Sequence, residues 1–315
     1  MLAKIRRVIN KIKLRIYDRD SLEYNLIMLN LEYENDIEKH NNNIFFKKLN
    51  LNMSLNQSFF MILGYKNALL LKDVVDATFI LDNNYLYIEL NDLKFKIQTA
   101  EELFILREIF VDGIYNFCLN SNLDKYILID IGMNVSFASC YFGRVKKIPK
   151  IISFEPFKPT FIEAKENIRL NSLENTIYAN NYGLGDTDES LSVEYTEEFK
   201  GQVGVQGVDY IRSKIDKKIV ENIIIKDVNK VFNTMFKDFK TNRFILKIDC
   251  EGAEYQLIDN IPQNILDRCD IIMMEWHEKG AQKLEDWLIF NNFMLMSFSP
   301  HSTRVGMIYA IKNKI

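Results

Sequence analysis

The sequence predicts an α/β protein in which a mostly parallel sheet follows a smaller α+β region. From residue 126 onward, short apolar runs of the kind that form buried strands alternate with segments of helical periodicity. Two of these runs end in an acidic residue close to a glycine, in Asp130-Ile131-Gly132 and in Asp249-Cys250-Glu251-Gly252. Alternating strands and helices favour a parallel sheet with helices on both faces, and ligands bind at the carboxyl ends of such strands.

Length and composition fit a globular protein of one large or two modest domains. The 315 residues are 48% apolar and 26% charged, and the formal net charge is -3. This charge provides no global basic field, so nucleic acid is not an expected partner. The four cysteines form no C-x-x-C pair, which argues against a zinc site and a secreted disulfide framework and favours a cytoplasmic location. A membrane-spanning helix is not expected, because no run of about 18 apolar residues exists.

Residues 1–118 are expected to form the α+β region. Residues 1–20 carry seven Lys or Arg, with isoleucines and a valine at helical spacing between them. Such a basic helix either packs on its own protein, which we favour, or lies on an anionic membrane surface. Further along, Asp82-Asn83-Asn84 predicts a hairpin turn, and Thr99 with Glu102 forms a capping box that starts a helix. An Asn-rich loop is expected at 41–43 and strands at 68–71, 77–81, 85–90 and 93–97.

Residues 119–315 are expected to form the second domain. Strands are expected at 126–131, 150–154, 176–181, 244–249 and 271–276, with helices at 137–142, 159–170, 252–260 and 281–290. An insertion contains a strand at 191–195 and a Gly-rich and Val-rich piece at 201–208. The last two strands, 293–298 and 305–311, are joined by a short loop, which predicts an antiparallel hairpin at the edge of the sheet.

The ends of the first two strands predict a nucleotide-type site. Gly132 allows the backbone to approach a ligand closely, and Asp130 can accept a hydrogen bond either from a ligand amine or from its own turn. Glu155 ends the second strand, about 25 residues later, where an acid commonly binds the two ribose hydroxyls of a nucleoside. The G-x-G-x-x-G motif is missing, which makes a nicotinamide oxidoreductase an unfavoured alternative.

The fourth and fifth strands carry the candidate catalytic residues. Lys247 and Asp249 project to the same side of their strand, either as a buried ion pair or as functional groups. His277 ends the next strand, and a histidine has the pKa needed to take a proton from a hydroxyl near neutral pH. Alternatively, Asp249 and Glu275 hold a divalent cation that binds oxygens of the molecule carrying this hydroxyl. Glu251 and Glu254 suit a helix start, where the helix dipole favours negative charge, and are otherwise further site residues.

Taken together, four motifs resemble the FkbM family of S-adenosylmethionine-dependent methyltransferases. They are Asp130-x-Gly132-x-Asn134, Phe154-Glu155-Pro156, Asn167-x-x-x-Asn171 and Lys247-Ile-Asp249-x-Glu251-Gly252-Ala253-Glu254. The last motif is the most specific, and the resemblance covers about residues 126–278. It implies a class I methyltransferase fold and O-methylation, often of sugars or of sugar-bearing natural products.

With this reading of the chain as a methyltransferase, the candidate residues have expected roles. Asp249, His277, Lys247 and Glu251 are the expected catalytic residues, and Asp130, Gly132, Asn134, Ser136, Glu155 and Asn181 are expected to hold S-adenosylmethionine. The sequence departs from the family at Ser136, where the family usually has glycine and where serine adds a Cβ near the methionine part of the cofactor. The expected acceptor is a small molecule or a glycan. The alternative is a protein that binds the cofactor without catalysis, in which Ser136 marks decay of the site.

Overall fold

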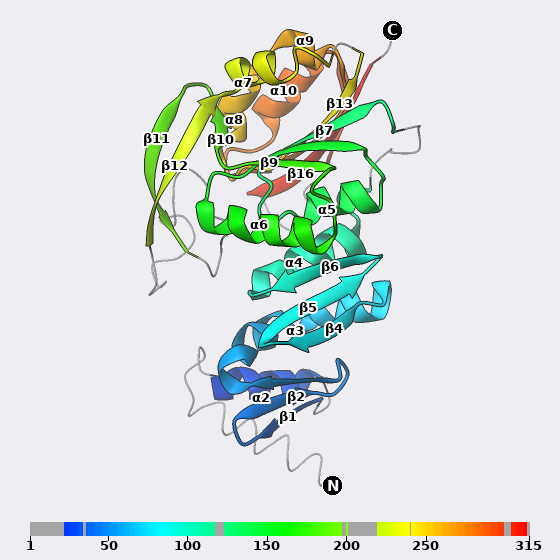
Figure 1. Cartoon of the computed structure of the whole chain (residues 1–315), viewed down its shortest axis with the longest axis vertical. Helices are drawn as coiled ribbons and strands as arrows, with labels where there is room; N and C mark the ends of the chain where they lie inside the picture. Colours follow the sequence, from blue (N-terminus) through cyan, green and yellow to red (C-terminus); the bar gives the residue numbers. More distant parts are fainter. Residues whose placement is uncertain are drawn as a thin grey trace. The chain divides into compact units, whose positions relative to one another are not determined.

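The computed structural model describes residues 22–33, 36–116, 123–196, 200, 219–239, 241–298 and 304–313 (Figure 1). The chain divides into two compact units, Met1–Gly113 and Ile114–Ile315. The predicted basic helix at 1–20, the piece at 201–208 and the loop at 299–303 lie outside the described residues. Among the helices in the described ranges, none is long and apolar enough to cross a membrane.

The first unit contains the same arrangement twice, a three-stranded antiparallel sheet followed by a helix. After α2 (Leu22–Glu32), the elements are β1 (Ile37–His40), β2 (Asn43–Phe46), β3 (Leu51–Ser54), α3 (Leu55–Val75), β4 (Thr78–Asp82), β5 (Tyr85–Leu90), β6 (Leu93–Ile97) and α4 (Ala100–Arg107), which continues into a π-helical turn at Glu108–Asp112. Asn83 and Asn84 have positive φ angles, and Thr99 and Glu102 exchange the hydrogen bonds of a capping box. The predicted turn and the predicted helix start are thus both confirmed.

The strand predicted at 68–71 is wrong, because these residues belong to the 21-residue helix α3. The buried positions of α3 include Met61, Tyr65, Ala68 and Leu69, which recur at helical spacing. The short apolar run is therefore part of a helix's buried stripe. Periodicity within four apolar residues cannot distinguish such a stripe from a buried strand.

Seven strands form the central sheet of the second unit, in the order β15-β16-β14-β13-β7-β8-β9. They are β7 (Tyr126–Ile131), β8 (Lys150–Phe154), β9 (Ile177–Asn180), β13 (Arg243–Ile248), β14 (Cys269–His277), β15 (Phe293–Phe298) and β16 (Val305–Lys312). Neighbouring strands run parallel, except that β16 is antiparallel to both β14 and β15. The sequence-based prediction of a mostly parallel sheet with an antiparallel C-terminal hairpin is confirmed.

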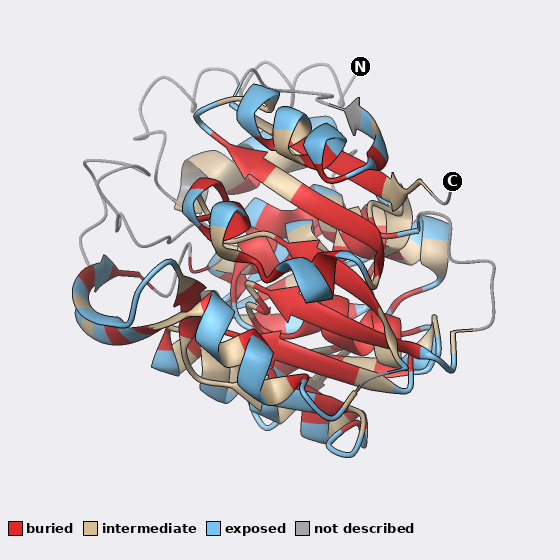
Figure 2. Ribbon diagram, turned by 90° about the horizontal axis from the view of Figure 1, so that it is seen from above, coloured by how far each residue is buried: buried red, intermediate tan, exposed pale blue. Residues whose placement is uncertain are grey.

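Helices cover both faces of this sheet. In Figure 1, α5 (Phe137–Arg144) and α6 (Lys158–Leu170) lie below it, and α7 (Val228–Met235), α8 (Glu254–Leu257) and α10 (Gln282–Phe290) lie above it. Above the sheet, Phe232 of α7 and Leu284 of α10 join the apolar core that β7 and β13 build. Figure 2 shows the result as buried strands surrounded by helices with exposed outer faces.

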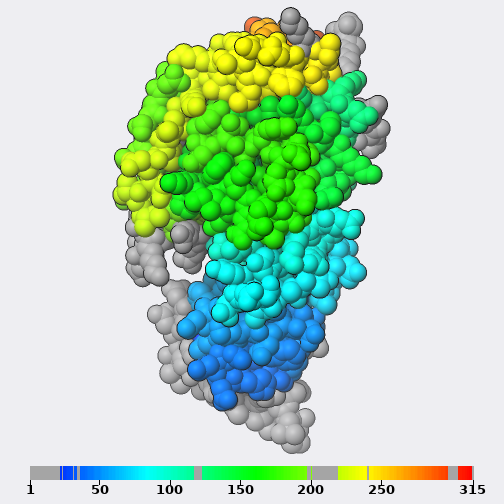
Figure 3. Space-filling view, viewed as in Figure 1, coloured from blue at the N-terminus to red at the C-terminus, as the bar shows by residue number. Residues whose placement is uncertain are grey.

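A smaller sheet flanks the central one, in the order β10-β12-β11. Its strands are β10 (Gly183–Gly185), β11 (Glu189–Tyr195) and β12 (Ile219–Asp227). The sequence predicted β11 but not its long antiparallel partner β12. In the space-filling view, the green atoms of residues around 150–195 adjoin the yellow atoms of residues around 219–260, although these segments are far apart in sequence (Figure 3).

The backbone makes its closest approach where β7 and β13 end side by side. From β7 the chain proceeds to β8 on one side of the sheet, whereas β13 lies on the other side, which makes this the switch point where open α/β sheets bind ligands. Asp249 N–H donates to the Ile131 carbonyl at 3.0 Å, and Gly132 N–H donates to the Phe154 carbonyl at 3.1 Å. Gly132 has a φ of +82°, and a Cβ placed on it would lie 1.6 Å from the Asp249 carbonyl oxygen. Only glycine permits this contact.

Replacing Gly132 with alanine should therefore destabilise the fold by more than backbone strain alone. Gly280 is a matched control, since its φ is +78° but a Cβ there would have nothing within 4 Å. Gly280→Ala should cost about 1–2 kcal/mol, the price of left-handed backbone, and Gly132→Ala at least about 2 kcal/mol more because of the steric clash. Urea unfolding of the two variants measures this difference, and equal losses would show that the two loops are not in contact.

Candidate active site

A pocket with an open volume of about 640 Å³ lies at the carboxyl ends of β7, β8 and β13. Five of the ten predicted site residues line it: Gly132, Asn134, Glu155, Asp249 and Glu251. The other five, Asp130, Ser136, Asn181, Lys247 and His277, lie next to the lining residues and are described below. The pocket lining therefore contains residues predicted to bind a nucleoside together with residues predicted to carry the chemistry.

Glu155 lies in the pocket wall with its carboxylate almost fully buried. Its two oxygens accept hydrogen bonds from the backbone N–H groups of Asn134 at 2.9 Å and Phe157 at 3.0 Å. Burial raises the pKa of Glu155 to about 7, although these two hydrogen bonds act in the opposite direction. A carboxylate has about four lone-pair positions, so two remain for donors inside the pocket.

Asn134 and Asn181 shape the loops on either side of Glu155. Asn134 has a φ of +50°, a conformation that asparagine tolerates better than most residues, and its side chain accepts a hydrogen bond from Val135 N–H at 2.7 Å. Asn181 donates its side-chain amide to the backbone carbonyls of Glu155 at 2.9 Å and Pro156 at 3.1 Å. In this structure Asn181 supports the loop that carries Glu155.

Asp130 and Lys247 form a buried ion pair behind the pocket wall. Their side chains are 0% and 3% exposed, with 3.2 Å between Lys247 Nζ and Asp130 Oδ1. Ser139, which no sequence motif marked, donates a 2.5 Å hydrogen bond to Asp130 Oδ2. Burial alone would lower the pKa of Lys247, but the charges of Asp130 and Asp249 outweigh this effect and raise it. The structure thus places Asp130 where it holds Lys247, not where it lines the pocket.

Ser136 is fully buried at the start of α5, with a φ of +71°. Left-handed backbone is unfavourable for serine and readily adopted by glycine, which gives a physical reason for the family's preference for glycine at this position. The Ser136 hydroxyl lies 3.8 Å from Cys140 Sγ, and the residue is not part of the pocket lining. The serine therefore adds its Cβ to the interior of the protein.

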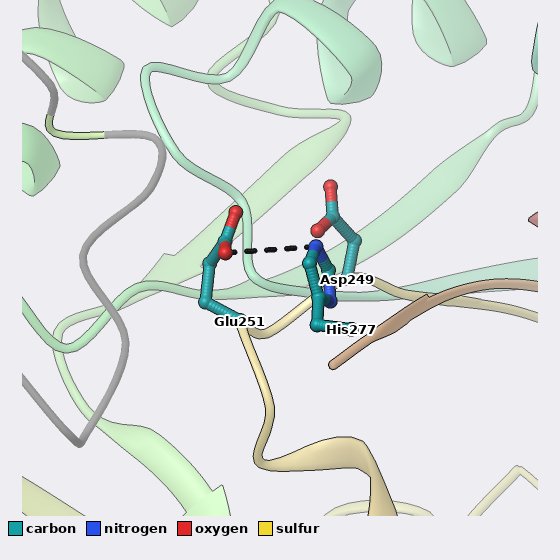
Figure 4. A group of neighbouring side chains, drawn as sticks. All are labelled: Asp249, Glu251 and His277. Carbon is teal, nitrogen blue, oxygen red and sulfur yellow. Dashed lines mark ion pairs between the residues drawn. The ribbon is translucent and has the colours of Figure 1, made fainter. Parts of the chain in front are cut away.

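Asp249 and Glu251, which line the pocket, lie beside His277 (Figure 4). One side-chain donor atom from each of the three lies within 4.8 Å of the other two. Glu251 Oε2 is 3.5 Å from His277 Nε2, and Glu275 Oε1 is 3.9 Å from the same nitrogen. Asp249 also lies 3.4 Å from Lys247 Nζ. The predicted catalytic residues are therefore one connected group.

Glu254 fixes the orientation of His277 from the opposite side. Its carboxylate is 0% exposed and accepts hydrogen bonds from the backbone N–H groups of Gly252 at 2.8 Å and His277 at 2.9 Å. The same carboxylate lies 3.4 Å from the ring nitrogen Nδ1 of His277. Tyr255 adds a 2.8 Å hydrogen bond from its hydroxyl to the His277 carbonyl. The imidazole is held so that Nε2 is on the side of Asp249 and Glu251.

The carboxylates around His277 change its acid–base behaviour. Burial would lower the pKa of His277, but Glu254 and then Glu251, Asp249 and Glu275 raise it to about 10. The imidazole is consequently protonated near pH 7 in this arrangement. A protonated histidine cannot accept the proton of a hydroxyl, so a base role for His277 requires that the imidazolium first lose its proton.

Lys200 lines the pocket, although no sequence motif pointed to it. Its side chain is 2% exposed and is paired with Glu163 of α6. The residue lies in the insertion between β9 and β13, where no periodic pattern indicates what faces the pocket. The position of Lys200 in the pocket lining depends on tertiary packing, so the sequence contains no pattern that predicts it.

Comparison with known proteins identifies the domain that holds this pocket. A family model described as the methyltransferase FkbM domain matches residues 130–296. Similar solved structures include an FkbM methyltransferase from Methylobacillus flagellatus KT, with 9% identity, coverage of 79% of this chain and 59% of that chain, and a TM-score of 0.41. The human methyltransferase 10 domain containing protein has 12% identity, coverage of 79% and 95%, and a TM-score of 0.41. TrmK from M. capricolum, in complex with S-adenosyl-homocysteine, has 10% identity, coverage of 65% and 68%, and a TM-score of 0.37. No curated protein matches the chain.

The matched segment covers more than half of the chain and contains all ten predicted site residues. Its sheet is the Rossmann-like sheet of class I methyltransferases, as the sequence predicts. This chain belongs to the FkbM family of methyltransferases.

Proposed function

We propose that this chain is an S-adenosylmethionine-dependent O-methyltransferase that acts on a hydroxyl group of a sugar or glycan. One observation carries the proposal. A single pocket is lined both by Gly132, Asn134 and Glu155 and by Asp249 and Glu251. A nucleoside-type cofactor and a polar acceptor can therefore meet within it. The free thiols of Cys140, Cys250 and Cys269 fit a reducing compartment such as the cytoplasm.

Gly132 and Glu155 suit the nucleoside part of the cofactor. When bound, S-adenosylmethionine supplies an activated methyl group on its sulfonium. Glu155 has two acceptor positions left for ribose hydroxyls after its bonds to the Asn134 and Phe157 N–H groups. Gly132 has no side chain and permits close approach of its backbone.

Asp249 suits the acceptor. Asp249 is 25% exposed and lines the pocket, so its carboxylate can hold the acceptor hydroxyl by accepting its hydrogen bond. Lys247 keeps that carboxylate in place from behind, at 3.4 Å. Holding an oxygen nucleophile in line with the methyl group is the main requirement for this reaction. The sugar or glycan as acceptor rests on the resemblance to the family, whose members often methylate sugars.

S-adenosylhomocysteine should bind the intact chain and raise its melting temperature, whereas NAD should not. A ligand that binds only the native state adds about 2.7 kcal/mol of stability at 100 times its Kd. Differential scanning fluorimetry with each ligand tests the cofactor directly. A shift with NAD and none with S-adenosylhomocysteine would contradict the proposal and favour an oxidoreductase.

Binding of S-adenosylhomocysteine should strengthen as the pH rises through about 7, because ribose hydroxyls need the ionised form of Glu155 and its pKa is about 7. The sign for stability is opposite. In the unfolded chain Glu155 ionises near its ordinary pKa. The free energy of unfolding of the unliganded protein therefore falls as the pH rises from about 4.5 to about 7. One pH unit below a pKa only about a tenth of the group is ionised, so affinity at pH 6 should be roughly tenfold below that at pH 8.

Calorimetric titrations with S-adenosylhomocysteine between pH 5.5 and 8.5 measure this dependence. Glu155→Gln is the matched control, because the amide keeps the shape of the carboxyl group without ionising in this range. Its affinity should be weaker and independent of pH. An equal pH dependence in both proteins would remove Glu155 from the ribose role.

Catalysis can be distinguished from cofactor binding alone by following a labelled methyl group. Purified chain should transfer it from S-adenosylmethionine to members of a panel of glycans and glycosides. Asp249→Asn should lower turnover by about 100-fold or more, because a neutral amide accepts a weaker hydrogen bond than a carboxylate and holds the hydroxyl less firmly in line with the methyl group. Its affinity for S-adenosylhomocysteine should change far less. Cofactor binding without transfer to any hydroxyl acceptor would favour the non-catalytic alternative.

A further inference from the structure

We propose that Asp249, Glu251 and His277 form a divalent-cation site in the pocket wall, and that its cation holds neighbouring hydroxyl oxygens of the acceptor. This inference rests on the proposed function, since it concerns how the acceptor is bound. It differs from the pair of Asp249 and Glu275 that the sequence suggests. The three donors come from the end of β13, the turn that follows it and the end of β14.

The spacing of the three donor atoms fits a cation. They lie within 4.8 Å of one another, and Glu251 Oε2 is 3.5 Å from His277 Nε2. Ligand bonds of about 2.1 Å place donors about 3 Å apart in neighbouring positions of an octahedron and about 4.2 Å apart in opposite ones. Small side-chain rotations therefore suffice to close the group around one ion.

Glu254, which is not one of the three donors, lies beside the ring nitrogen of His277 that faces away from them. The His277 side chain is 9% exposed, and Nδ1 is buried without a hydrogen bond among the described residues. Glu254 Oε1 lies 3.4 Å from that nitrogen. Histidine ligands almost always donate their second ring N–H to a carboxylate, a carbonyl or a water, which fixes the tautomer and the ring. A slight turn of the His277 ring gives Nδ1 this partner and directs Nε2 at the ion.

The position of the cluster explains what the cation does. Asp249 and Glu251 are 25% and 21% exposed and line the same pocket as the cofactor-binding residues, so the ion is accessible from that pocket. Three protein ligands leave coordination positions of the cation open. Two adjacent hydroxyls of a sugar can occupy two neighbouring coordination positions. Coordination lowers the pKa of a bound oxygen, so the proton of a coordinated hydroxyl can leave to water. The acceptor class is thus a vicinal diol.

The chemistry of the donors selects the probe. Carboxylate oxygens suit Mg²⁺ and Mn²⁺, whereas imidazole suits later transition metals. Mn²⁺ accepts both kinds of donor and is visible by electron paramagnetic resonance when free in solution. We therefore expect the intact chain, stripped with chelator and dialysed, to bind one Mn²⁺ in the absence of cofactor and acceptor.

Two variants with the same chemical change test the ligand set. Glu251→Gln should weaken Mn²⁺ binding by about tenfold or more, since altered metal surroundings typically cost 10–100-fold in affinity. Glu275→Gln is the matched control, because Glu275 is 3.9 Å from His277 Nε2 but outside the group of three. It should retain its affinity to within about a factor of three, as expected for a charge that acts only at a distance. Unfolding midpoints in chelator verify that both variants are folded.

Each outcome decides the inference. No Mn²⁺ binding below about 1 mM, the weak end for protein sites, would show that the imidazolium itself occupies the space among the carboxylates. Equal losses in the two variants, or none in Glu251→Gln, would show that the ion lies elsewhere. Binding of S-adenosylhomocysteine to the metal-free chain is measured separately. If it is retained without Mn²⁺ binding, the metal site fails and the proposed function stands; if Mn²⁺ binds and the nucleoside does not, the proposed function fails.

Discussion

The ammonium group of Lys247 joins the two loops that create the pocket. It donates to the Gly132 carbonyl at 2.5 Å and pairs with Asp130 and Asp249 at 3.2 Å and 3.4 Å. Because Lys247 is almost fully buried, its charge is tolerable only with these partners in place. The three contacts fix the end of β7 against the end of β13. The positions of Glu155 on the β8 side and of Asp249 on the β13 side depend on this junction.

The regularity of the second unit explains why its fold could be predicted from sequence. Parallel strands buried on both faces appear as continuous apolar runs, and each central strand begins and ends within two residues of the predicted bounds. The first unit was less accessible to this reasoning. Its strands β1, β2 and β3 are only four residues long, which is too short to establish an apolar pattern. The alternating strand β12 was missed because nothing in its sequence indicates its distant partner β11.

Motif reasoning located the site but could not separate residues that line it from residues that support it. Asp130 and Asp249 both occupy strand ends with similar sequence surroundings, yet Asp130 is completely buried and Asp249 reaches the pocket. The register pairs Asp130 with Lys247, so Asp249 lies two residues further along, beyond the end of β13. Ser139 of helix α5 also donates a hydrogen bond to Asp130. The acid–base state of His277 was equally hidden. It depends on four carboxylates that two strands and a turn bring together, and an unperturbed pKa contains no information about them.

The placement of β16 between β14 and β15 bears on the order in which the parts of the site form during folding. Val305 at the start of β16 is the register partner of His277 at the end of β14. The strand that pairs beside the histidine therefore follows it by 28 positions, and the helix α10 and the strand β15 lie between them in the chain. By contrast, Lys247 of β13 and its register partner Asp130 of β7 are 117 residues apart, so the loop that their pairing closes is much longer. The surroundings of His277 should therefore form earlier in folding than the junction of β7 with β13 on which the pocket depends.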